Sequence, residues 1–243
     1  IIPNFSRMTC FFEGVHNQVF LGTNGGLLIF DETSKQLSTV SKKLSIVSNS
    51  VIRNISKDTQ NNLWFATSDG FAKFDTKTNQ YSNYCIPNTS ISYIFADSKN
   101  RIWIGTTNSG FYKVKIDANS KLAYKKISIV GNQIYQIIEG NYDEMWISTN
   151  KGVTLLDCSS NSCKVINCFL NSPYYYYRSN EMFKIELLKD KTGNIWFGDL
   201  KVENGLFYYS QKTKKVEAII ADQQNPYGLQ QYGFTTMYID RSD

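Results

Sequence analysis

Short apolar stretches alternate with polar turns along the whole chain, and none of the apolar stretches is longer than a β-strand. The most apolar stretch recurs five times, at residues 19–23, 63–67, 102–106, 145–149 and 195–199. Each copy has an aromatic residue at its centre, with spacings of 44, 39, 43 and 50 residues: Phe20, Trp64, Trp103, Trp146 and Trp196. Because nearly every position in these stretches is apolar, we predict strands that are buried on both faces.

The residues around each aromatic strand also repeat. An apolar-rich strand and then an acidic residue come before it, the acidic residues being Glu13, Asp58, Asp97, Glu139 and Asp190. After it, a short turn leads to a glycine and an apolar residue, the glycines being Gly26, Gly70, Gly110, Gly152 and Gly205. A third strand then ends at Asp31, Asp75, Asp117, Asp157 or Ser210, and a serine or threonine follows three residues later. A fourth, more polar strand such as residues 80–84 closes each unit.

Each repeated feature has a physical reason. Glycine in the second turn permits a positive φ or a close backbone approach without steric cost. An Asp followed by Ser or Thr three residues later stabilises a tight turn by bonding its own backbone. Since the acidic residues before the aromatic strand recur together with the turn, we interpret Asp58, Asp97 and Asp190 as turn scaffold and not as catalytic groups.

Units of four short strands at a period of about 40–50 residues are typical of a β-propeller, in which each sheet needs a neighbour on both faces. We therefore predict an all-β fold, a β-propeller of four-stranded antiparallel blades with five complete blades and the first strand of a sixth. The expected domain covers residues 1–243, with blades at approximately 6–45, 46–87, 88–129, 130–170 and 178–222 and the start of a sixth at 233–243. An open arc would leave sheet faces and edges uncovered. We expect a fragment of a larger, seven-bladed ring, the alternative being termini that pair to close a smaller one.

Three insertions interrupt the repeat, and blade geometry predicts that all three lie on one rim. They are residues 171–180, 199–204 and 223–232. Aromatic faces beside amide and guanidinium donors suit a sugar ring or an aromatic acid. The candidate ligand-binding residues are Tyr174, Tyr175, Tyr177, Arg178, Lys201, Asn204, Tyr227, Gln230 and Tyr232. The alternatives are that these tyrosines form an interface with a second propeller domain or a homodimer mate, or pack locally.

The cysteines and the single histidine offer little chemistry. Cys158 and Cys163 flank a tight turn, where a disulfide would suggest an oxidising compartment. Cys10, Cys85 and Cys168 fall in predicted strands and are expected to be small buried apolar residues. His16 lies in a turn without partners for general-base catalysis. We expect no metal site and no cofactor, and the sequence contains no phosphate-binding loop or nucleophile elbow.

The net charge is +5, and we interpret the lysines as scattered singly along the predicted strands and turns. A nucleic-acid-binding protein more often shows a clustered basic stripe, so we expect no nucleic-acid partner. No stretch approaches the about 18 apolar residues of a membrane span, and any link to a membrane would run through segments absent from this chain. The first residues have neither an initiator methionine nor the pattern of a signal peptide, so we expect a processed or excised piece of a protein.

The repeat resembles the two-component regulator propeller repeat, whose consensus runs as a strand, Asp-x-x-Gly-Asn-Leu-Trp-Ile-Gly-Thr, then Gly-Leu and a Phe-Asp turn. The matching segments are residues 190–198, 97–106, with Asn100-Arg101 at the Gly-Asn position, and 70–75. The first copy departs most, since Phe20 replaces the tryptophan. The resemblance implies a periplasmic, extracytoplasmic sensor domain of a hybrid two-component histidine kinase that detects glycan fragments.

We therefore expect a non-catalytic ligand-sensing module with an oligosaccharide or another small ligand on the insertion-bearing face. One alternative is a glycan-active lyase or glycosidase, which would need two converging carboxylates from Glu181, Asp199, Glu203 and Asp222. Another alternative is a protein-interaction scaffold.

Overall fold

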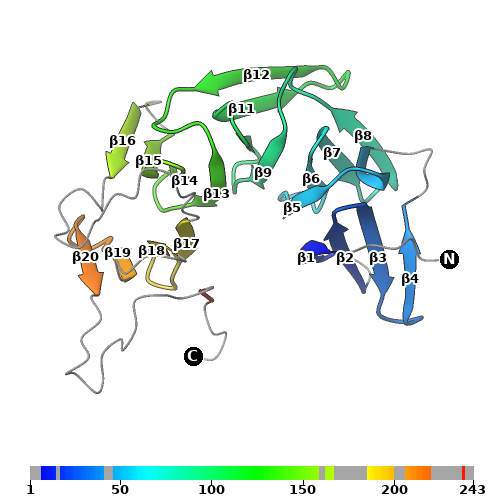
Figure 1. Cartoon of the computed structure of the whole chain (residues 1–243), viewed down its shortest axis with the longest axis horizontal. Helices are drawn as coiled ribbons and strands as arrows, with labels where there is room; N and C mark the ends of the chain where they lie inside the picture. The colour runs from blue at the N-terminus through cyan, green and yellow to red at the C-terminus, as the bar shows by residue number, and fades with distance from the viewer. Residues whose placement is uncertain are drawn as a thin grey trace. The chain divides into compact units, whose positions relative to one another are not determined.

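The structure is a computed structural model that describes residues 7–14, 17–40, 46–158, 162–166, 185–199, 206–219 and 237–238. These residues form five four-stranded antiparallel sheets, each with its strands in sequence order (Figure 1). The chain divides into two compact units, Ile1–Ile127 and Ser128–Asp243. The predicted all-β class and four-stranded units are confirmed.

The first unit contains three sheets, here called blades 1 to 3. Blade 1 consists of β1 (Met8–Glu13), β2 (Gln18–Thr23), β3 (Gly26–Asp31) and β4 (Gln36–Thr39), and a short 3-10 helix, η1 (Ile46–Ser48), follows it. Blade 2 consists of β5 (Ile52–Lys57), β6 (Leu63–Thr67), β7 (Gly70–Asp75) and β8 (Gln80–Tyr84). Blade 3 consists of β9 (Ile91–Ala96), β10 (Ile102–Thr106), β11 (Phe111–Ile116) and β12 (Leu122–Ile127).

The second unit contains blades 4 and 5. Blade 4 consists of β13 (Ile134–Glu139), β14 (Glu144–Thr149), β15 (Gly152–Asp157) and β16 (Ser162–Ile166). Blade 5 consists of β17 (Ile185–Lys189), β18 (Ile195–Asp199), β19 (Leu206–Tyr209) and β20 (Val216–Ile219). Of the predicted opening strand of a sixth blade, only Met237 and Tyr238 are among the described residues, and they are not in a strand.

The aromatic strands form the cores between neighbouring blades of each unit. In β6 and β10 every residue is buried, as the continuous apolar pattern predicts. Phe20 of blade 1 packs with Phe65 and Phe74 of blade 2. The centroid of the Phe20 ring lies 6.2 Å from the centroid of each of these two rings. On the other face of blade 2, Trp64 packs in a cluster with Ile94 and Ile104 of blade 3. Each fully buried aromatic or aliphatic side chain contributes about 1.5–3 kcal/mol, so the facing blades stabilise each other.

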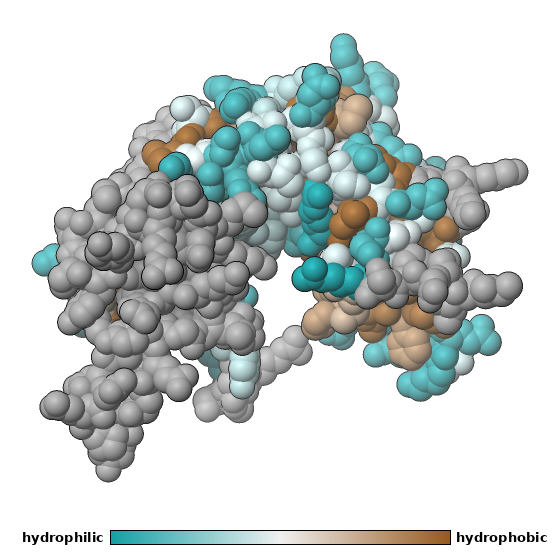
Figure 2. Space-filling view, in the orientation of Figure 1, coloured by the Kyte–Doolittle hydropathy of each residue, from teal (hydrophilic) through white to brown (hydrophobic). Residues whose placement is uncertain are grey.

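One face of blade 1 carries exposed apolar side chains among the described residues. Phe11 is 72% exposed and Met8 is 59% exposed, and Figure 2 shows apolar surface over β1–β3. Leu21, which follows Phe20, and Phe65, which follows Trp64, occupy equivalent positions of their blades. Phe65 is fully buried against blade 1, whereas Leu21 is only half-buried. The equivalent face is therefore covered in blade 2 and uncovered in blade 1.

The first strands of neighbouring blades are joined by a repeated polar contact. The residue ten positions before Trp64 and before Trp146 accepts a hydrogen bond from the backbone N–H of the next first strand: Asn54 Oδ1 from Ile94 at 2.9 Å and Gln136 Oε1 from Leu187 at 2.7 Å. Glu186 occupies the same position and accepts from the N–H of Met237 at 2.9 Å. Met237 thus makes the contact with blade 5 that Ile94 makes with blade 2, and the sixth first strand stays a prediction.

Candidate functional site

All nine predicted ligand-binding residues lie outside the described residues: Tyr174, Tyr175, Tyr177, Arg178, Lys201, Asn204, Tyr227, Gln230 and Tyr232. The same holds for His16, for Cys168 and for the carboxylates of Glu181, Asp199, Glu203 and Asp222. The insertion-bearing rim and the distances between those carboxylates therefore stay predictions. The repeated acids Asp58, Asp97 and Asp190 do lie among the described residues, and their contacts show what they do.

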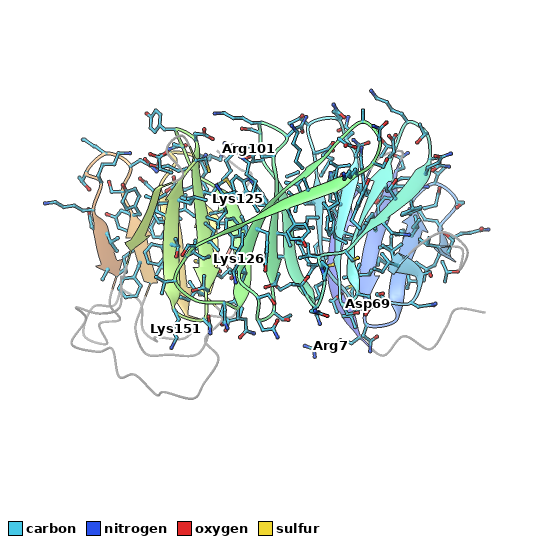
Figure 3. All side chains as sticks on the ribbon, turned by 90° about the horizontal axis from the view of Figure 1, so that it is seen from above. Arg7, Asp69, Arg101, Lys125, Lys126 and Lys151 are labelled. Carbon is cyan, nitrogen blue, oxygen red and sulfur yellow. The ribbon has the colours of Figure 1, made fainter. Side chains whose placement is uncertain are left out.

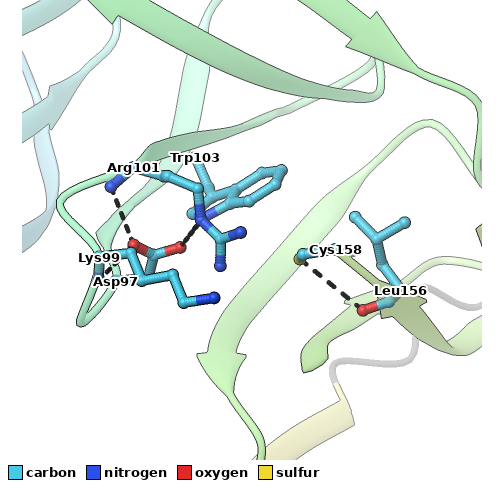
Figure 4. Close-up of polar contacts among 6 residues, drawn as sticks. All are labelled: Asp97, Lys99, Arg101, Trp103, Leu156 and Cys158. Carbon is cyan, nitrogen blue, oxygen red and sulfur yellow. Dashed lines mark hydrogen bonds and ion pairs between the residues drawn. The ribbon is translucent and has the colours of Figure 1, made fainter. Parts of the chain in front are cut away.

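The repeated aspartate is a turn scaffold in blades 2, 3 and 5. In blade 3, Asp97 Oδ1 accepts the N–H groups of Lys99 at 3.0 Å and Arg101 at 2.8 Å. Its Oδ2 accepts the Arg101 Nε–H at 2.5 Å and the indole N–H of Trp103 at 2.8 Å (Figure 4). The carboxylate therefore fixes the turn and also the aromatic residue at the start of the buried strand. We call this arrangement the Asp–Trp lock.

Asp58 and Asp190 repeat the lock with the same geometry. Their Oδ2 atoms accept the indole N–H of Trp64 at 3.0 Å and of Trp196 at 2.7 Å. In each case Oδ1 accepts two backbone N–H groups of the turn. The scaffold role predicted for Asp58, Asp97 and Asp190 is confirmed.

The charge of Asp190 is stabilised by its neighbours. Partial burial raises the pKa of this carboxyl, but the hydrogen bonds from Thr192, Trp196 and Asn194 together outweigh burial and hold its pKa below the ordinary value of 3.8. A catalytic acid needs the opposite shift, toward neutral pH. Asp190 is thus poorly suited to general-acid chemistry.

In blades 1 and 4 the predicted turn acids, Glu13 and Glu139, do not occupy the position of the lock aspartate, so their assignment to it was wrong. The position that closes this turn is Gly14 in blade 1 and Gly140 in blade 4, whose N–H groups each donate at 2.8 Å to the carbonyl four residues ahead, as the N–H of Asp97 does at 3.0 Å. Glu13 and Glu139 come one residue earlier, as the last residues of β1 and β13. A carboxylate at that point of the pleat faces a different direction, because successive side chains alternate across a strand.

Glycine at this position changes the surroundings of the aromatic residue. A Cβ on Gly140 would lie 2.7 Å from Nε1 of Trp146, so the indole occupies the space that the aspartate takes in other blades. Trp146 is fully buried, and its indole N–H has no hydrogen-bond partner within the described part of the chain. Blade 4 therefore keeps the aromatic residue and loses the lock.

The second turn of blades 1 to 4 is held by a threonine and a glycine. The hydroxyl of Thr67 donates to the carbonyl of Gly70 at 2.9 Å and accepts the N–H of Asp69 at 3.2 Å, and Thr23, Thr106 and Thr149 repeat this pattern. The glycine φ angles are positive, for example 141° at Gly70. The predicted reason for glycine here is confirmed.

The third turn is capped by its aspartate, as predicted. Asp31 Oδ1 accepts the N–H groups of Thr33 at 2.9 Å and Ser34 at 2.8 Å, and Asp75 makes the same two contacts in blade 2. The bond from the Ser34 N–H lowers the pKa of Asp31. Like the Asp–Trp lock, these carboxylates are held as turn acceptors.

A groove of about 700 Å³ lies between blades 2 and 3. One wall carries Trp64, Lys73 and Tyr84, and the other carries Ile102 and Val114. The carboxylate of Asp58 also borders the groove, but its two oxygens already accept four hydrogen bonds. Asp75, Asp117, Arg101, Lys113 and Lys115 also line the groove, so it can hold a ligand against apolar, amide and charged surfaces.

The cysteines agree with the sequence predictions only in part. Cys10 is half-buried in β1 beside Gly22, and burial raises its pKa. Cys85 is exposed and follows the end of β8, so its predicted place in a buried strand was wrong. The outermost strand of a blade has no further strand beside it, which leaves the residue after it in solvent.

The strand register bears on the predicted Cys158–Cys163 disulfide. Cys163 lies opposite Leu156, and Ser162 lies opposite Asp157, so Cys158 is displaced diagonally from Cys163. Diagonal neighbours in a sheet stand about 7–8 Å apart, farther than directly opposed ones. The sulfur of Cys158 lies 3.9 Å from the carbonyl oxygen of Leu156 (Figure 4). The prediction that the two cysteines lie directly opposite each other was wrong. The Cys163 side chain is outside the described residues, so the disulfide stays a prediction.

Membrane-spanning helices and metal-ligating clusters are both absent from the described residues. None of their helices has the length and apolar character needed to cross a membrane. None of their His, Cys, Asp and Glu side chains form a group of three that could hold a metal ion.

Comparison with known proteins finds a family match for two segments of the chain. A family model described as the two component regulator propeller matches residues 45–69 and 85–108. Among curated proteins, the chain is similar to histidine kinase P4 of Formosa agariphila, with 24% identity over 149 residues that cover 56% of this chain and 11% of that protein.

Solved structures show the same fold at low identity. The extracellular domain of a hybrid two component system from B. thetaiotaomicron is 17% identical with a TM-score of 0.73, over 96% of this chain and 31% of that one. Virginiamycin B lyase from Staphylococcus aureus is 14% identical with a TM-score of 0.67, over 90% of this chain and 72% of that one. This chain thus spans about a tenth of the curated relative and under a third of the extracellular domain. Its fold is that of a β-propeller, and two segments of it match the two component regulator propeller model.

Proposed function

We propose that this chain is a non-catalytic, extracytoplasmic sensor module of a hybrid two-component signalling protein and that its ligand is an oligosaccharide. The observation that carries the proposal is the Asp–Trp lock. The carboxylates beside Trp64, Trp103 and Trp196 are engaged as turn acceptors, which leaves ligand binding as the chemistry that the described blades support.

Similarity to signalling proteins supports the location and the role. The relatives include a histidine kinase and the extracellular domain of a hybrid two component system. A periplasmic module of this kind would act through a membrane span and kinase carried by other parts of the protein. The ligand can change the signal only if it binds two arrangements of the module, or of a homodimer, with different affinities.

The candidate ligand surface is the insertion-bearing rim, with Tyr175, Tyr177 and Arg178 as its principal contacts. Two of these tyrosines could stack on sugar rings while the guanidinium donates to hydroxyl or carboxyl oxygens. A second propeller domain or a homodimer mate beside this rim would be the alternative use of the same residues.

A binding assay separates these uses. The protein is titrated with a panel of oligosaccharides by calorimetry, and so is the triple variant Tyr175→Ala, Tyr177→Ala, Arg178→Ala. The matched control is Tyr142→Ala, which removes a tyrosine that is 85% exposed in a turn of blade 4. We expect one oligosaccharide class to bind and the triple variant to weaken it at least tenfold, with the control unchanged.

Two results would refute the proposal in different ways. If no oligosaccharide bound and the triple variant instead dissociated a dimer, the rim would be an interface. If an oligosaccharide were shortened during the titration, the module would be an enzyme, a class to which the fold neighbour virginiamycin B lyase belongs by name.

A further inference from the structure

The charge of this chain is concentrated in blade 3. Residues 91–127 contain two acidic residues, Asp97 and Asp117, and seven basic ones: Lys99, Arg101, Lys113, Lys115, Lys121, Lys125 and Lys126. The excess of five equals the net charge of the whole chain, so the remaining residues are balanced. The sequence-based interpretation of the lysines as scattered singly was therefore wrong. The strand pairing of β11 and β12 brings together residues that are separated in sequence.

The two acids of blade 3 do little to neutralise this charge. Asp97 is the carboxylate of the Asp–Trp lock, and it forms an ion pair with Arg101. Asp117 Oδ1 accepts the backbone N–H groups of Asn119 and Lys121, both at 2.9 Å. Within the described part of the chain, no ion pair involves Lys113, Lys115, Lys121, Lys125 or Lys126.

Two of the lysines stand directly opposite each other. In the ladder between β11 and β12, Lys113 pairs with Lys125. Lys113 Nζ and Arg101 Cζ each lie 5.4 Å from the centre of the Trp103 ring, so three cations share one face of the blade. Like charges directly opposite in a sheet are destabilising. The fold alone gives no reason for this pairing.

The other blades do not have this arrangement. The pairs at the equivalent positions are Ile29–Ser38, Lys73–Ser82, Leu155–Lys164 and Tyr208–Glu217. In blade 5 the tyrosine hydroxyl donates to the glutamate, which is a stabilising pair. Features shared by every blade build the scaffold, so a feature of blade 3 alone points to a specific partner.

The cations are accessible on both sides of the outermost strand. Lys115, Lys121, Lys125 and Lys126 are exposed, and Lys113 and Arg101 are half-buried. On the opposite face of β12, Lys126 Nζ lies 6.0 Å from the Tyr112 ring, beside Tyr124, which is 47% exposed. Figure 3 shows Arg101, Lys125 and Lys126 on this blade, and Figure 2 shows hydrophilic residues over β12. We call Arg101, Lys113, Lys115, Lys121, Lys125 and Lys126 the basic strip.

We infer that the basic strip binds an acidic polysaccharide, a linear sugar polymer with carboxylate or sulfate groups. This inference rests on the proposed extracytoplasmic location, where such polymers are accessible, and adds a second surface to the sensor. Lysine ammonium groups act as point charges and suit repeated anionic groups without requiring a fixed geometry. The ring of Tyr124 offers a flat surface for a sugar on the same face of β12 as Lys126. Binding of this kind depends on salt, because exposed charges are screened.

The test uses the protein and three polymers of matched length: dextran sulfate, polygalacturonate and neutral dextran. We expect one or both of the acidic polymers to bind at 50 mM salt, with affinity falling at least tenfold at 300 mM, and no binding of neutral dextran. The two acidic arms distinguish sulfate from carboxylate. A short DNA duplex is the fourth arm, and tighter binding of DNA than of either acidic polymer would overturn the choice of partner.

Charge-matched variants locate the site. Lys113→Gln with Lys125→Gln, and Lys121→Gln with Lys125→Gln, each remove two charges of the strip, and the second pair leaves the cations over Trp103 in place. The control, Lys77→Gln with Lys212→Gln, removes two exposed lysines elsewhere. Both strip variants should weaken polymer binding at least tenfold and the control less than twofold. Equal weakening in all three, or no acidic polymer bound by the parent protein, would overturn the inference.

These outcomes are separate from those of the oligosaccharide assay. The strip variants should bind the sensor's oligosaccharide as the parent protein does, because they leave the insertion-bearing rim intact. Loss of polymer binding with oligosaccharide binding retained supports both proposals. Absence of polymer binding with oligosaccharide binding retained removes only the basic strip.

Discussion

Single residues decide how each aromatic strand is anchored. The carboxylate of Asp97 accepts four hydrogen bonds and is nearly inaccessible to solvent, with 1% of its surface exposed. A buried carboxylate with four donors contributes more than an ordinary turn residue, since hydrogen bonds to charged groups are worth about 1.5–3 kcal/mol each. Gly140 and Trp146 show the opposite solution, an indole packed onto a bare Cα.

We predict that Asp97→Asn destabilises the protein by about 2–4 kcal/mol, because an amide NH₂ cannot accept the two donors at Oδ2. Urea unfolding followed by tryptophan fluorescence measures the loss. The control is Glu32→Gln, an exposed acid-to-amide change in a turn of blade 1, which should shift the unfolding free energy by less than about 0.5 kcal/mol. If Asp97→Asn left the free energy of unfolding unchanged, the Asp–Trp lock would not stabilise the fold.

Gly140→Ala should destabilise by about 1–3 kcal/mol, since its Cβ would overlap the buried Trp146 ring. Thermal unfolding compares it with Thr59→Ala, a change at an exposed turn residue that creates no such overlap. An unchanged melting temperature for Gly140→Ala would mean that the indole can move aside at no cost.

At the scale of the strand, the sequence predicted most of what the structure contains. Five aromatic strands and the turns around them follow from the spacing of Trp64 and its equivalents, and β6 and β10 are buried throughout as a fully apolar strand requires. The inter-blade contacts of Asn54 and Gln136 could not be predicted, since they depend on how neighbouring first strands are aligned. The glycine in place of the lock aspartate was missed because Glu139 lies only one residue away.

The outermost strand of blade 2 carries a titration that can be measured. Burial raises the pKa of Tyr81 to about 12 from its ordinary value of 10.0, and the ring packs 4.6 Å from that of Phe74. Because folding disfavours the ionised phenol, its contribution to stability is complete below pH 10 and is lost as the pH rises toward 12. Tyr81→Phe should reduce the loss of stability between these pH values. An identical pH profile for the variant and the parent protein would contradict the assigned burial.

At the scale of the whole molecule, the expectation of further blades can be tested on the face of blade 1 that carries Phe11 and the half-buried Leu21. If a further blade covers that face in the intact protein, Leu21→Glu should destabilise it by about 2–4 kcal/mol, as burial of an unpaired charge would. Unfolding of the intact protein tests this against Tyr142→Glu, a change at a fully accessible residue. A tolerated Leu21→Glu would indicate that this face stays in solvent.

The functional site was the least predictable part of the molecule. Its residues were chosen because they interrupt the repeat, and an insertion carries no periodic pattern from which its conformation can be derived. The basic strip was missed for the opposite reason, since Lys113 and Lys125 become neighbours only when β11 and β12 pair. Both surfaces concern binding, in keeping with blades whose recurring acids serve the turns.

The central claim is that this propeller binds an oligosaccharide and does not transform it. The most direct test incubates the protein with the oligosaccharide that binds best, measures saturable binding by calorimetry, and then weighs the recovered sugar by mass spectrometry. The account predicts saturable binding and a sugar of unchanged mass. Shortened products, a mass lowered by an elimination, or an absence of binding across the panel would contradict it.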